Sequence, residues 1–156
     1  MKRYVLGIAS TDQGKFVVVQ KLTPEWQRGL YNFPGGKIEP GETPYDAIHR
    51  EWKEEIGQHI PRADWEIFAV LREECVFEVV CLRTLTDAEP EPMKMMGSEY
   101  EPAEPVNLFE PHDIAAMSYG GDALNNLGWI INLALDRERR RDVVTVTYSD
   151  KPKETP

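Results

Sequence analysis

The chain has 156 residues and a formal net charge of −9. This length accommodates one domain with a substantial core but not two. The negative charge disfavours nucleic acid and anionic membranes as partners, because both are bound through basic surfaces. No apolar run reaches the roughly 18 residues of a membrane-spanning helix. The N-terminus also lacks the apolar stretch of a signal peptide, because Thr11, Asp12 and Gln13 interrupt it.

Strands are predicted first along the chain, over residues 3–10 and 15–22, with a turn signal between them at Asp12–Gly14. A loop follows over residues 23–31. A short strand at Asn32–Phe33 then runs into the Pro-Gly-Gly sequence that ends at Gly36, where the chain must turn tightly. The first part of the chain is therefore predicted to be a β-hairpin followed by a third strand.

A helix is predicted to begin after Thr43 and to end near Gly57. Thr43 is a suitable N-cap residue, Pro44 stands at the first helical position, and Asp46 lies three residues after the cap. Gly57 stands where a C-terminal glycine commonly ends a helix. These signals define the boundaries of the helix from local sequence alone.

The remaining predicted elements are strands at 65–72 and 75–84, a long loop at 86–105, a strand at 106–109, a short helix near 111–117, a longer helix from Asp122 to about Arg139, and a weak strand or ordered arm at 143–148. Loops as long as 86–105 are usually functional or disordered. We expect one domain over residues 1–142 and a partly disordered C-terminal arm over residues 143–156. The order of elements predicts an α+β fold rather than a wound βαβ sheet.

The two cysteines, Cys75 and Cys81, are predicted to lie on one strand, six residues apart. At roughly 3.3 Å per residue this spacing is about 20 Å, whereas a disulfide needs Cα atoms within about 7 Å. Two free thiols indicate a reducing compartment and a cytoplasmic protein. We interpret both as small core residues rather than as redox groups or metal ligands.

The predicted helix carries an apolar face and an acidic face side by side. At about 100° per residue, four apolar residues fall within one arc: Tyr45, Ile48, Trp52 and Ile56. Glu51, Glu54 and Glu55 fall on the neighbouring arc. The acidic face therefore borders the core rather than pointing away from it, which places it beside a cleft.

Clustered carboxylates destabilise a helix unless a cation neutralises them. Each like-charge pair at i,i+3 or i,i+4, such as Glu51 with Glu54 or Glu55, costs about 0.2–0.5 kcal/mol. Mg²⁺ and Mn²⁺ prefer oxygen ligands and would offset this cost. Arg50 is placed to pair with Glu54 or with a neighbouring carboxylate, and its fork-shaped guanidinium suits this better than a lysine.

An acid-rich helix end is also a common solvated surface pattern, so further positions must decide between a surface and a site. Residues 36–58 match the pattern G-x5-E-x7-R-E-U-x-E-E-x-G-U, where U is a bulky apolar residue, at every position except the last. Gly36, Glu42 and Gly57 stand in register with the helix residues, and Gln58 is the departure. This agreement favours a site.

The pattern is the signature of the Nudix hydrolases, which the chain resembles. The run of residues 33–39, Phe-Pro-Gly-Gly-Lys-Ile-Glu, resembles the MutT-like branch of that family. The resemblance implies a Nudix-type α/β/α sandwich with a mixed central sheet, over about residues 3–138. The departure at Gln58 affects local packing more than chemistry.

The resemblance also implies roles for individual residues. Glu51, Glu54 and Glu55 resemble the metal-binding and catalytic carboxylates, and Arg50 resembles the residue that orients Glu51. Glu51 is our candidate for the base that accepts a proton from water. The carbonyl group of Gly35 resembles a direct ligand of the metal, Mg²⁺ or Mn²⁺.

Outside the helix, further residues take roles by resemblance. Glu42 resembles a loop glutamate that supports the helix and often contacts the metal through water. MutT-like members have another glutamate in a later loop, and Glu99, as a metal ligand, and Glu101 are the candidates here. Most acidic residues in such a loop are simply solvated, which is the alternative for both.

Three residues are candidates for binding the substrate: Lys37, Phe33 and Asn126. Lys37 is placed to approach a phosphate, and Asn126 lies where MutT-like enzymes use an asparagine to read a purine edge. The alternative for Asn126 is a surface or helix-start amide. Phe33, Trp26 and Met95–Met96 are candidates for stacking on a base, although such residues more often belong to the core.

The implied function is metal-dependent hydrolysis of a nucleoside diphosphate linked to another group, first of all a nucleoside triphosphate cleaved to a nucleoside monophosphate. ADP-ribose, nucleotide sugars and dinucleoside polyphosphates are alternative substrates. ADP-ribose is disfavoured, because the region of Glu73–Glu74 lacks a proline found in some ADP-ribose-cleaving members. A non-catalytic nucleotide-binding domain and a prenyl diphosphate isomerase also remain open, as do a monomer and a homodimer.

Overall fold

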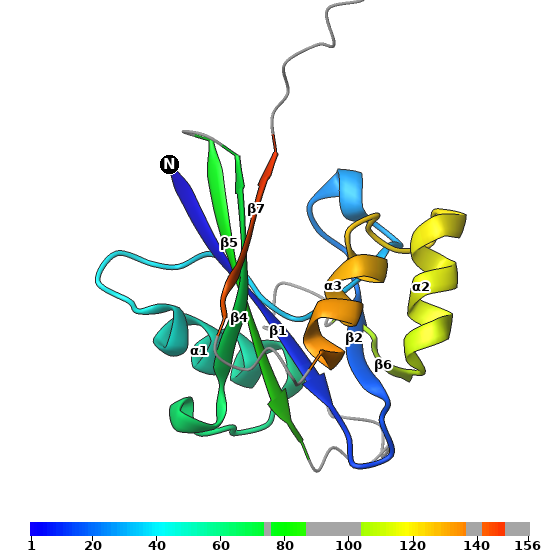
Figure 1. Cartoon of the computed structure of the whole chain (residues 1–156), viewed down its shortest axis with the longest axis horizontal. Helices are drawn as coiled ribbons and strands as arrows, with labels where there is room; N and C mark the ends of the chain where they lie inside the picture. The colour runs from blue at the N-terminus through cyan, green and yellow to red at the C-terminus, as the bar shows by residue number, and fades with distance from the viewer. Residues whose placement is uncertain (74–75, 87–103, 137–141, 149–156) are drawn as a thin grey trace, which may run out of the picture.

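A mixed β-sheet forms the centre of the fold (Figure 1). The computed structural model describes residues 1–73, 76–86, 104–136 and 142–148. Within these residues the sheet has seven strands in the order β3-β2-β1-β5-β4-β7, and β6 also pairs with β2. The strands are β1 (Lys2–Ser10), β2 (Phe16–Gln20), β3 (Tyr31–Asn32), β4 (Glu66–Glu73), β5 (Phe77–Leu85), β6 (Val106–Phe109) and β7 (Val144–Tyr148). The helices are α1 (Pro44–Ile56), α2 (Pro111–Gly120) and α3 (Leu127–Leu135).

Helices cover both faces of this sheet, with α1 on one side and α2 and α3 on the other (Figure 1). Successive side chains of a strand point to opposite faces. Val5 and Ala9 of β1 therefore pack in the core cluster beneath α1, while Leu6 and Ile8 pack in the cluster beneath α3. The predicted α/β/α sandwich with a mixed central sheet is confirmed.

The boundaries of α1 agree with the sequence prediction. The hydroxyl of Thr43 accepts a hydrogen bond from the Asp46 N–H at 3.2 Å, and the Asp46 carboxylate accepts one from the Thr43 N–H at 3.1 Å. Gly57 ends the helix with a left-handed conformation, φ 77°. Both devices satisfy backbone groups that the helix leaves unpaired at its ends.

The helix predicted from Asp122 begins later, at Leu127. The reason is pairing with β3: Tyr31 donates its N–H to the Asp122 carbonyl at 2.9 Å and accepts from the Leu124 N–H at 3.1 Å. Residues held in this extended contact cannot also make helical hydrogen bonds. Apolar periodicity alone did not reveal this competition, because β3 lies far away in the sequence.

Residues 144–148 form an edge strand, β7, which pairs in parallel with β4. The segment predicted as a weak strand or arm therefore extends the sheet of its own chain, and the domain boundary at residue 142 stays a prediction. Cys81 is a buried free thiol in β5, while Cys75 lies outside the described residues. Among the described helices, none is long and apolar enough to cross a membrane.

Candidate active site

The loop before α1 lies directly against β1. Val5 donates its N–H to the Gly36 carbonyl at 2.8 Å, and Gly7 donates to the Pro34 carbonyl at 2.8 Å. A Cβ atom on Gly35 would overlap the backbone oxygen of Val5, so only glycine fits this close approach. The Gly35–Gly36 turn is thereby held in a defined position beside the sheet.

Gly36 makes room for the carboxylate of Glu51. A Cβ atom on Gly36 would collide with all three atoms of that carboxylate group. Glu51 is mostly buried, with its side chain 13% exposed. The structure therefore brings a catalytic candidate of α1 against the glycine turn, although the two lie fifteen positions apart in the sequence.

Arg50 is the centre of an ion-pair network that we call the Arg50 cluster, made of Arg50, Glu42, Glu51 and Glu54. The guanidinium donates to both oxygens of Glu42, at 2.8 and 2.9 Å, to Glu51 at 2.7 Å and to Glu54 at 3.3 Å. It also donates to the Lys37 carbonyl at 2.9 Å. One arginine therefore fixes three carboxylates and the glycine-containing loop.

The carboxylates of this region differ in their affinity for protons. Hydrogen bonds from Arg50 lower the pKa of Glu42 to about 2. Burial raises the pKa of Glu51, and hydrogen bonding to Arg50 only partly opposes this. Burial likewise raises the pKa of Glu55 to about 7 against the attraction of Lys21. The support residue is thus firmly ionised, while the two buried acids hold protons more tightly.

Glu55 belongs to a second network, the Lys21 triad, made of Lys21, Glu55 and Glu104. The ammonium group of Lys21 lies 3.0 Å from Glu55 Oε1 and 2.6 Å from Glu104 Oε2. The other oxygen of each carboxylate accepts a backbone N–H, from Gly35 at 2.8 Å and from Leu22 at 2.9 Å. All three side chains of the triad are largely shielded from solvent.

The sequence prediction missed Lys21 and Glu104. The later-loop candidates Glu99 and Glu101 lie outside the described residues. Glu104 comes just before β6, and Lys21 comes just after β2, with which β6 pairs antiparallel. Recognising that strand pairing from sequence would have placed Glu104 beside Lys21, because antiparallel partners bring the end of one strand to the start of the other.

The donor set of α1 suits a hard divalent cation, since Glu51, Glu54 and Glu55 all offer carboxylate oxygens. Glu54 is the open one, with 58% of its side chain exposed. As they stand, however, no three His, Cys, Asp or Glu side chains among the described residues are grouped closely enough to hold a metal. Arg50 and Lys21 each attract a different part of the acidic face.

The substrate candidates occupy different environments. Lys37 is exposed, with its ammonium 4.0 Å from the Glu39 carboxylate. Asn126 precedes α3, and its Oδ1 is buried without a hydrogen-bond partner among the described residues. Phe33 is fully buried in the core cluster beneath α3, which corrects the prediction that its ring contacts a substrate. Trp26 is 69% exposed, so the alternative of a core residue is wrong for it.

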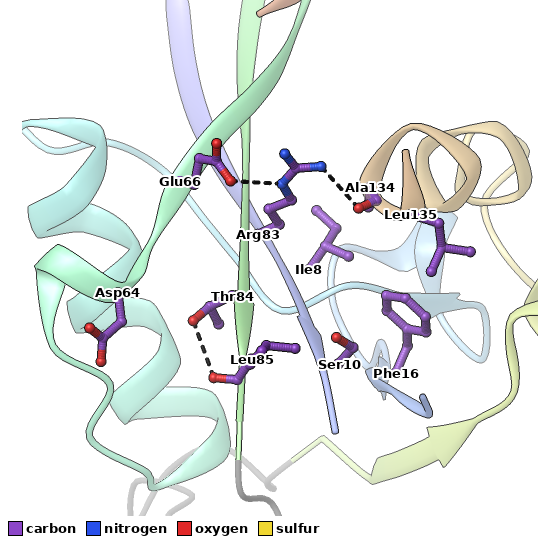
Figure 2. A pocket seen from close by; sticks show the side chains of 10 residues that line it. All are labelled: Ile8, Ser10, Phe16, Asp64, Glu66, Arg83, Thr84, Leu85, Ala134 and Leu135. Carbon is purple, nitrogen blue, oxygen red and sulfur yellow. Dashed lines mark hydrogen bonds and ion pairs between the residues drawn. The ribbon is translucent and has the colours of Figure 1, made fainter. Parts of the chain in front are cut away.

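A separate cavity of about 400 Å³ lies between the sheet and the end of α3 (Figure 2). Its polar centre is Arg83, which donates to Glu66 at 3.0 Å and to the Ala134 carbonyl at 3.1 Å. None of the predicted site residues that the structure describes lines it. The carboxylates of α1 therefore stay the candidate site, because ionisable groups converge there.

Comparisons with known proteins identify the family of the chain. A family model described as the NUDIX domain matches residues 1–123. The chain therefore belongs to the Nudix family, which confirms the predicted family.

Individual relatives are similar over parts of their length. The chain is 41% identical over 51 residues to an 8-oxo-dGTP diphosphatase of Haemophilus influenzae, a stretch that covers 33% of this chain and 38% of that protein. The chain thus spans less than half the length of this curated relative.

Two solved structures share the fold. A MutT protein from Bacillus halodurans superposes with a TM-score of 0.67 at 18% identity, over 96% of this chain and 92% of the other. The NUDIX domain of Shewanella oneidensis NrtR, solved with ADP ribose, superposes with a TM-score of 0.67 at 18% identity, over 87% of each chain. At these identities the likeness concerns the fold alone.

Proposed function

We propose that this protein is a metal-dependent hydrolase that cleaves a nucleoside triphosphate to a nucleoside monophosphate. The observation that carries the proposal is the position of Glu51, which lies against Gly36 with one oxygen held by Arg50 at 2.7 Å. A buried, oriented carboxylate next to a glycine turn is suited to accept a proton from a water molecule.

Mg²⁺, with Mn²⁺ as an alternative, is the cofactor of the proposal. The Gly35 carbonyl and the carboxylates of Glu51, Glu54 and Glu55 are the groups that would hold it, and all are hard oxygen donors. The missing Cβ of Gly36 lets the Glu51 carboxylate lie directly against the glycine turn that carries the Gly35 carbonyl, which fits such a role. When bound, the metal draws charge from the diphosphate and assists departure of the leaving group.

The residues of the chain take different roles in the proposed reaction. Glu51 takes the proton of the attacking water, and Arg50 holds Glu51 in position while it also fixes Glu42 and the loop carbonyl of Lys37. Glu54, at the edge of the cluster, also takes part in catalysis. Glu104 joins the set as a second candidate for the later-loop glutamate beside Glu99, because it lies in the same triad as Glu55.

A purine nucleotide is the preferred substrate class. Asn126 has a buried carbonyl oxygen that no donor of the described part of the chain reaches, and such a group costs free energy until a donor reaches it. The N–H or amino groups on the edge of a purine are donors of this kind. Lys37, exposed beside the glycine turn, is suited to approach the phosphates. The sequence similarity to an 8-oxo-dGTP diphosphatase supports a purine triphosphate as the substrate.

Other activities compete with this proposal. ADP-ribose, nucleotide sugars and dinucleoside polyphosphates remain alternative substrates, and the NUDIX domain of NrtR was solved with ADP ribose. Binding without cleavage is a further alternative. We propose a cytoplasmic protein, monomeric or homodimeric, that acts on small nucleotides and not on nucleic acid or membranes.

The test is a panel of nucleoside triphosphates, including 8-oxo-dGTP, together with ADP-ribose, nucleotide sugars and dinucleoside polyphosphates. Products are identified by chromatography in the presence and absence of Mg²⁺, with Glu51→Gln as the inactive control. Release of nucleoside monophosphate and pyrophosphate from a triphosphate supports the proposal. Tight nucleotide binding without any cleavage would instead establish the non-catalytic alternative.

A further inference from the structure

The Lys21 ammonium lies at carboxylate oxygens that would have to be free for the proposed metal ion to bind. It lies between Glu55 Oε1 and Glu104 Oε2, at 3.0 and 2.6 Å. The remaining oxygens of these carboxylates accept hydrogen bonds from the N–H groups of Gly35 and Leu22. Every oxygen of the pair is therefore already engaged by the protein.

The triad is shielded from solvent, which strengthens its internal attraction. Exposed fractions of the side chains are 12% for Lys21, 18% for Glu55 and 16% for Glu104. Charges interact more strongly where water is excluded. By contrast, Glu54 is 58% exposed and shares Arg50 with two other carboxylates, so one part of the acidic face is open and the other is closed by Lys21.

We propose that Lys21 is an internal counter-cation that competes with the divalent ion for Glu55 and Glu104 and so sets the metal affinity of the protein. This inference rests on the proposed metal-dependent function. Glu55 can bind the ion through Oε1 only once the Lys21 ammonium has moved away. The flexible four-carbon stem of a lysine allows such a movement.

Removing the Lys21 charge is expected to strengthen metal binding for two reasons. The carboxylate oxygens become available, and the ion no longer meets a positive charge at close range. At the effective dielectric of a protein surface this repulsion is large enough that we expect Lys21→Met to bind Mn²⁺ about tenfold more tightly. A merely structural lysine would weaken binding when removed, because the carboxylates would lose their placement.

The experiment is calorimetric titration of Mn²⁺ into the metal-free protein without nucleotide, for wild type, Lys21→Met and Lys53→Met. Lys53 is an exposed lysine of α1, so its variant carries the same change in net charge. We expect tighter binding for Lys21→Met and an unchanged affinity for Lys53→Met. Thermal unfolding adds a second readout: Lys21→Met should unfold at a lower temperature without metal and gain more from Mn²⁺.

The wild-type protein provides a test that needs no variant to fold. The Lys21 ammonium signal in ¹H–¹⁵N spectra should shift on addition of Mg²⁺, and the Lys53 signal should not. Equal or weaker Mn²⁺ binding by Lys21→Met, or a Lys21 signal insensitive to Mg²⁺, overturns the inference while leaving the metal site intact. A wild type that binds no Mn²⁺ and cleaves no nucleotide overturns the proposed function as well.

Discussion

The Arg50 cluster and a second network around Glu78 use the same two residue types in opposite proportions. In the Arg50 cluster one arginine serves three carboxylates, Glu42, Glu51 and Glu54. In the Glu78 cluster, made of Glu78, Arg3 and Arg72, one buried carboxylate of β5 accepts hydrogen bonds from two arginines of the neighbouring strands β1 and β4. Arg3 donates one at 3.1 Å, and Arg72 donates two, at 3.1 and 2.5 Å.

We infer that this difference separates the candidate site from a structural ion pair. Glu78 is satisfied by the chain itself, with more positive than negative groups around it. The Arg50 cluster keeps an excess of negative charge, which the protein leaves uncompensated at some cost to the helix. Uncompensated carboxylates are typical of positions where a ligand or metal supplies the missing charge. Substitutions in the Arg50 cluster should therefore affect turnover, and substitutions in the Glu78 cluster should affect stability.

The largest expected effect is that of Glu51→Gln. The amide keeps the shape of the side chain but cannot accept the proton, so turnover should fall by about 10²–10⁴-fold. Steady-state kinetics on the cleaved nucleotide measure the loss, and circular dichroism checks that the fold is intact. Glu78→Gln serves as the matched control in the same assay. Near wild-type turnover for Glu51→Gln would make the role assigned to Glu51 wrong.

Gly36→Ala should act on the same carboxylate indirectly. The added methyl group collides with the Glu51 carboxylate, which must rotate away from its position beside the loop. We expect turnover to fall by about 10–100-fold, as is usual when a catalytic group is displaced by an ångström or so. Gly120→Ala, where the new methyl meets one atom of the described residues, at 3.8 Å, is the control and should retain turnover. Equal kinetics for both variants would contradict the close fit of Gly36 and Glu51.

Glu78→Gln should leave turnover unchanged but reduce stability. The neutral amide removes the charge that assists the three hydrogen bonds from Arg3 and Arg72. We expect a loss of about 1–2 kcal/mol in the free energy of unfolding, because both arginines are half exposed. Urea denaturation at neutral pH measures this difference. A large loss of turnover with unchanged stability would reverse the assignment of the two clusters.

The effect of Glu78→Gln should also depend on pH. Burial opposes the charge on Glu78, but the hydrogen bonds from Arg72 and Arg3 outweigh it and lower the pKa from its ordinary value of 4.5. A lowered pKa contributes stability that is complete above 4.5 and is lost as the pH falls through the folded-state pKa. The difference in the free energy of unfolding between wild type and variant should therefore become smaller at acidic pH. A difference that grows below pH 4 would contradict the direction of the shift.

The smallest effect is expected for the exposed pair of Glu25 and Arg28. These side chains lie 2.9 Å apart, but 83% and 59% of their surfaces are exposed. Water and salt screen such a pair, so Glu25→Gln should change the free energy of unfolding by less than about 0.5 kcal/mol. The same urea titration provides the measurement. A loss as large as that of Glu78→Gln would show that burial does not explain the difference between the pairs.

Local sequence predicted the part of the site that is built from neighbouring residues. Thr43, Pro44 and Gly57 define α1 through hydrogen bonds within a few positions, and the spacing of Glu51, Glu54 and Glu55 then follows from helix geometry. The Arg50 cluster spans only residues 42–54 for the same reason. Capping and helical periodicity act over short distances, so they can be read without knowing the rest of the fold.

The Lys21 triad could not be predicted in this way. Glu55 lies 34 positions from Lys21, and Glu104 lies 83 positions away. Their contact depends on the pairing of β2 with β6 and on the packing of α1 against the sheet. Long-range pairing is chosen by the whole set of strands and not by the residues of any one of them.

The start of α3 and the position of Phe33 show the same limit. Residues 122–124 have a sequence compatible with a helix but pair with Tyr31 instead, and Phe33 faces the core although it borders the glycine turn. The family, α1 and its acidic face follow from short-range patterns in the chain. Contacts between distant segments decide which cationic side chains pair with those acids and which neighbours reach them. The physical reason is that burial and charge pairing exist only once the sheet has formed.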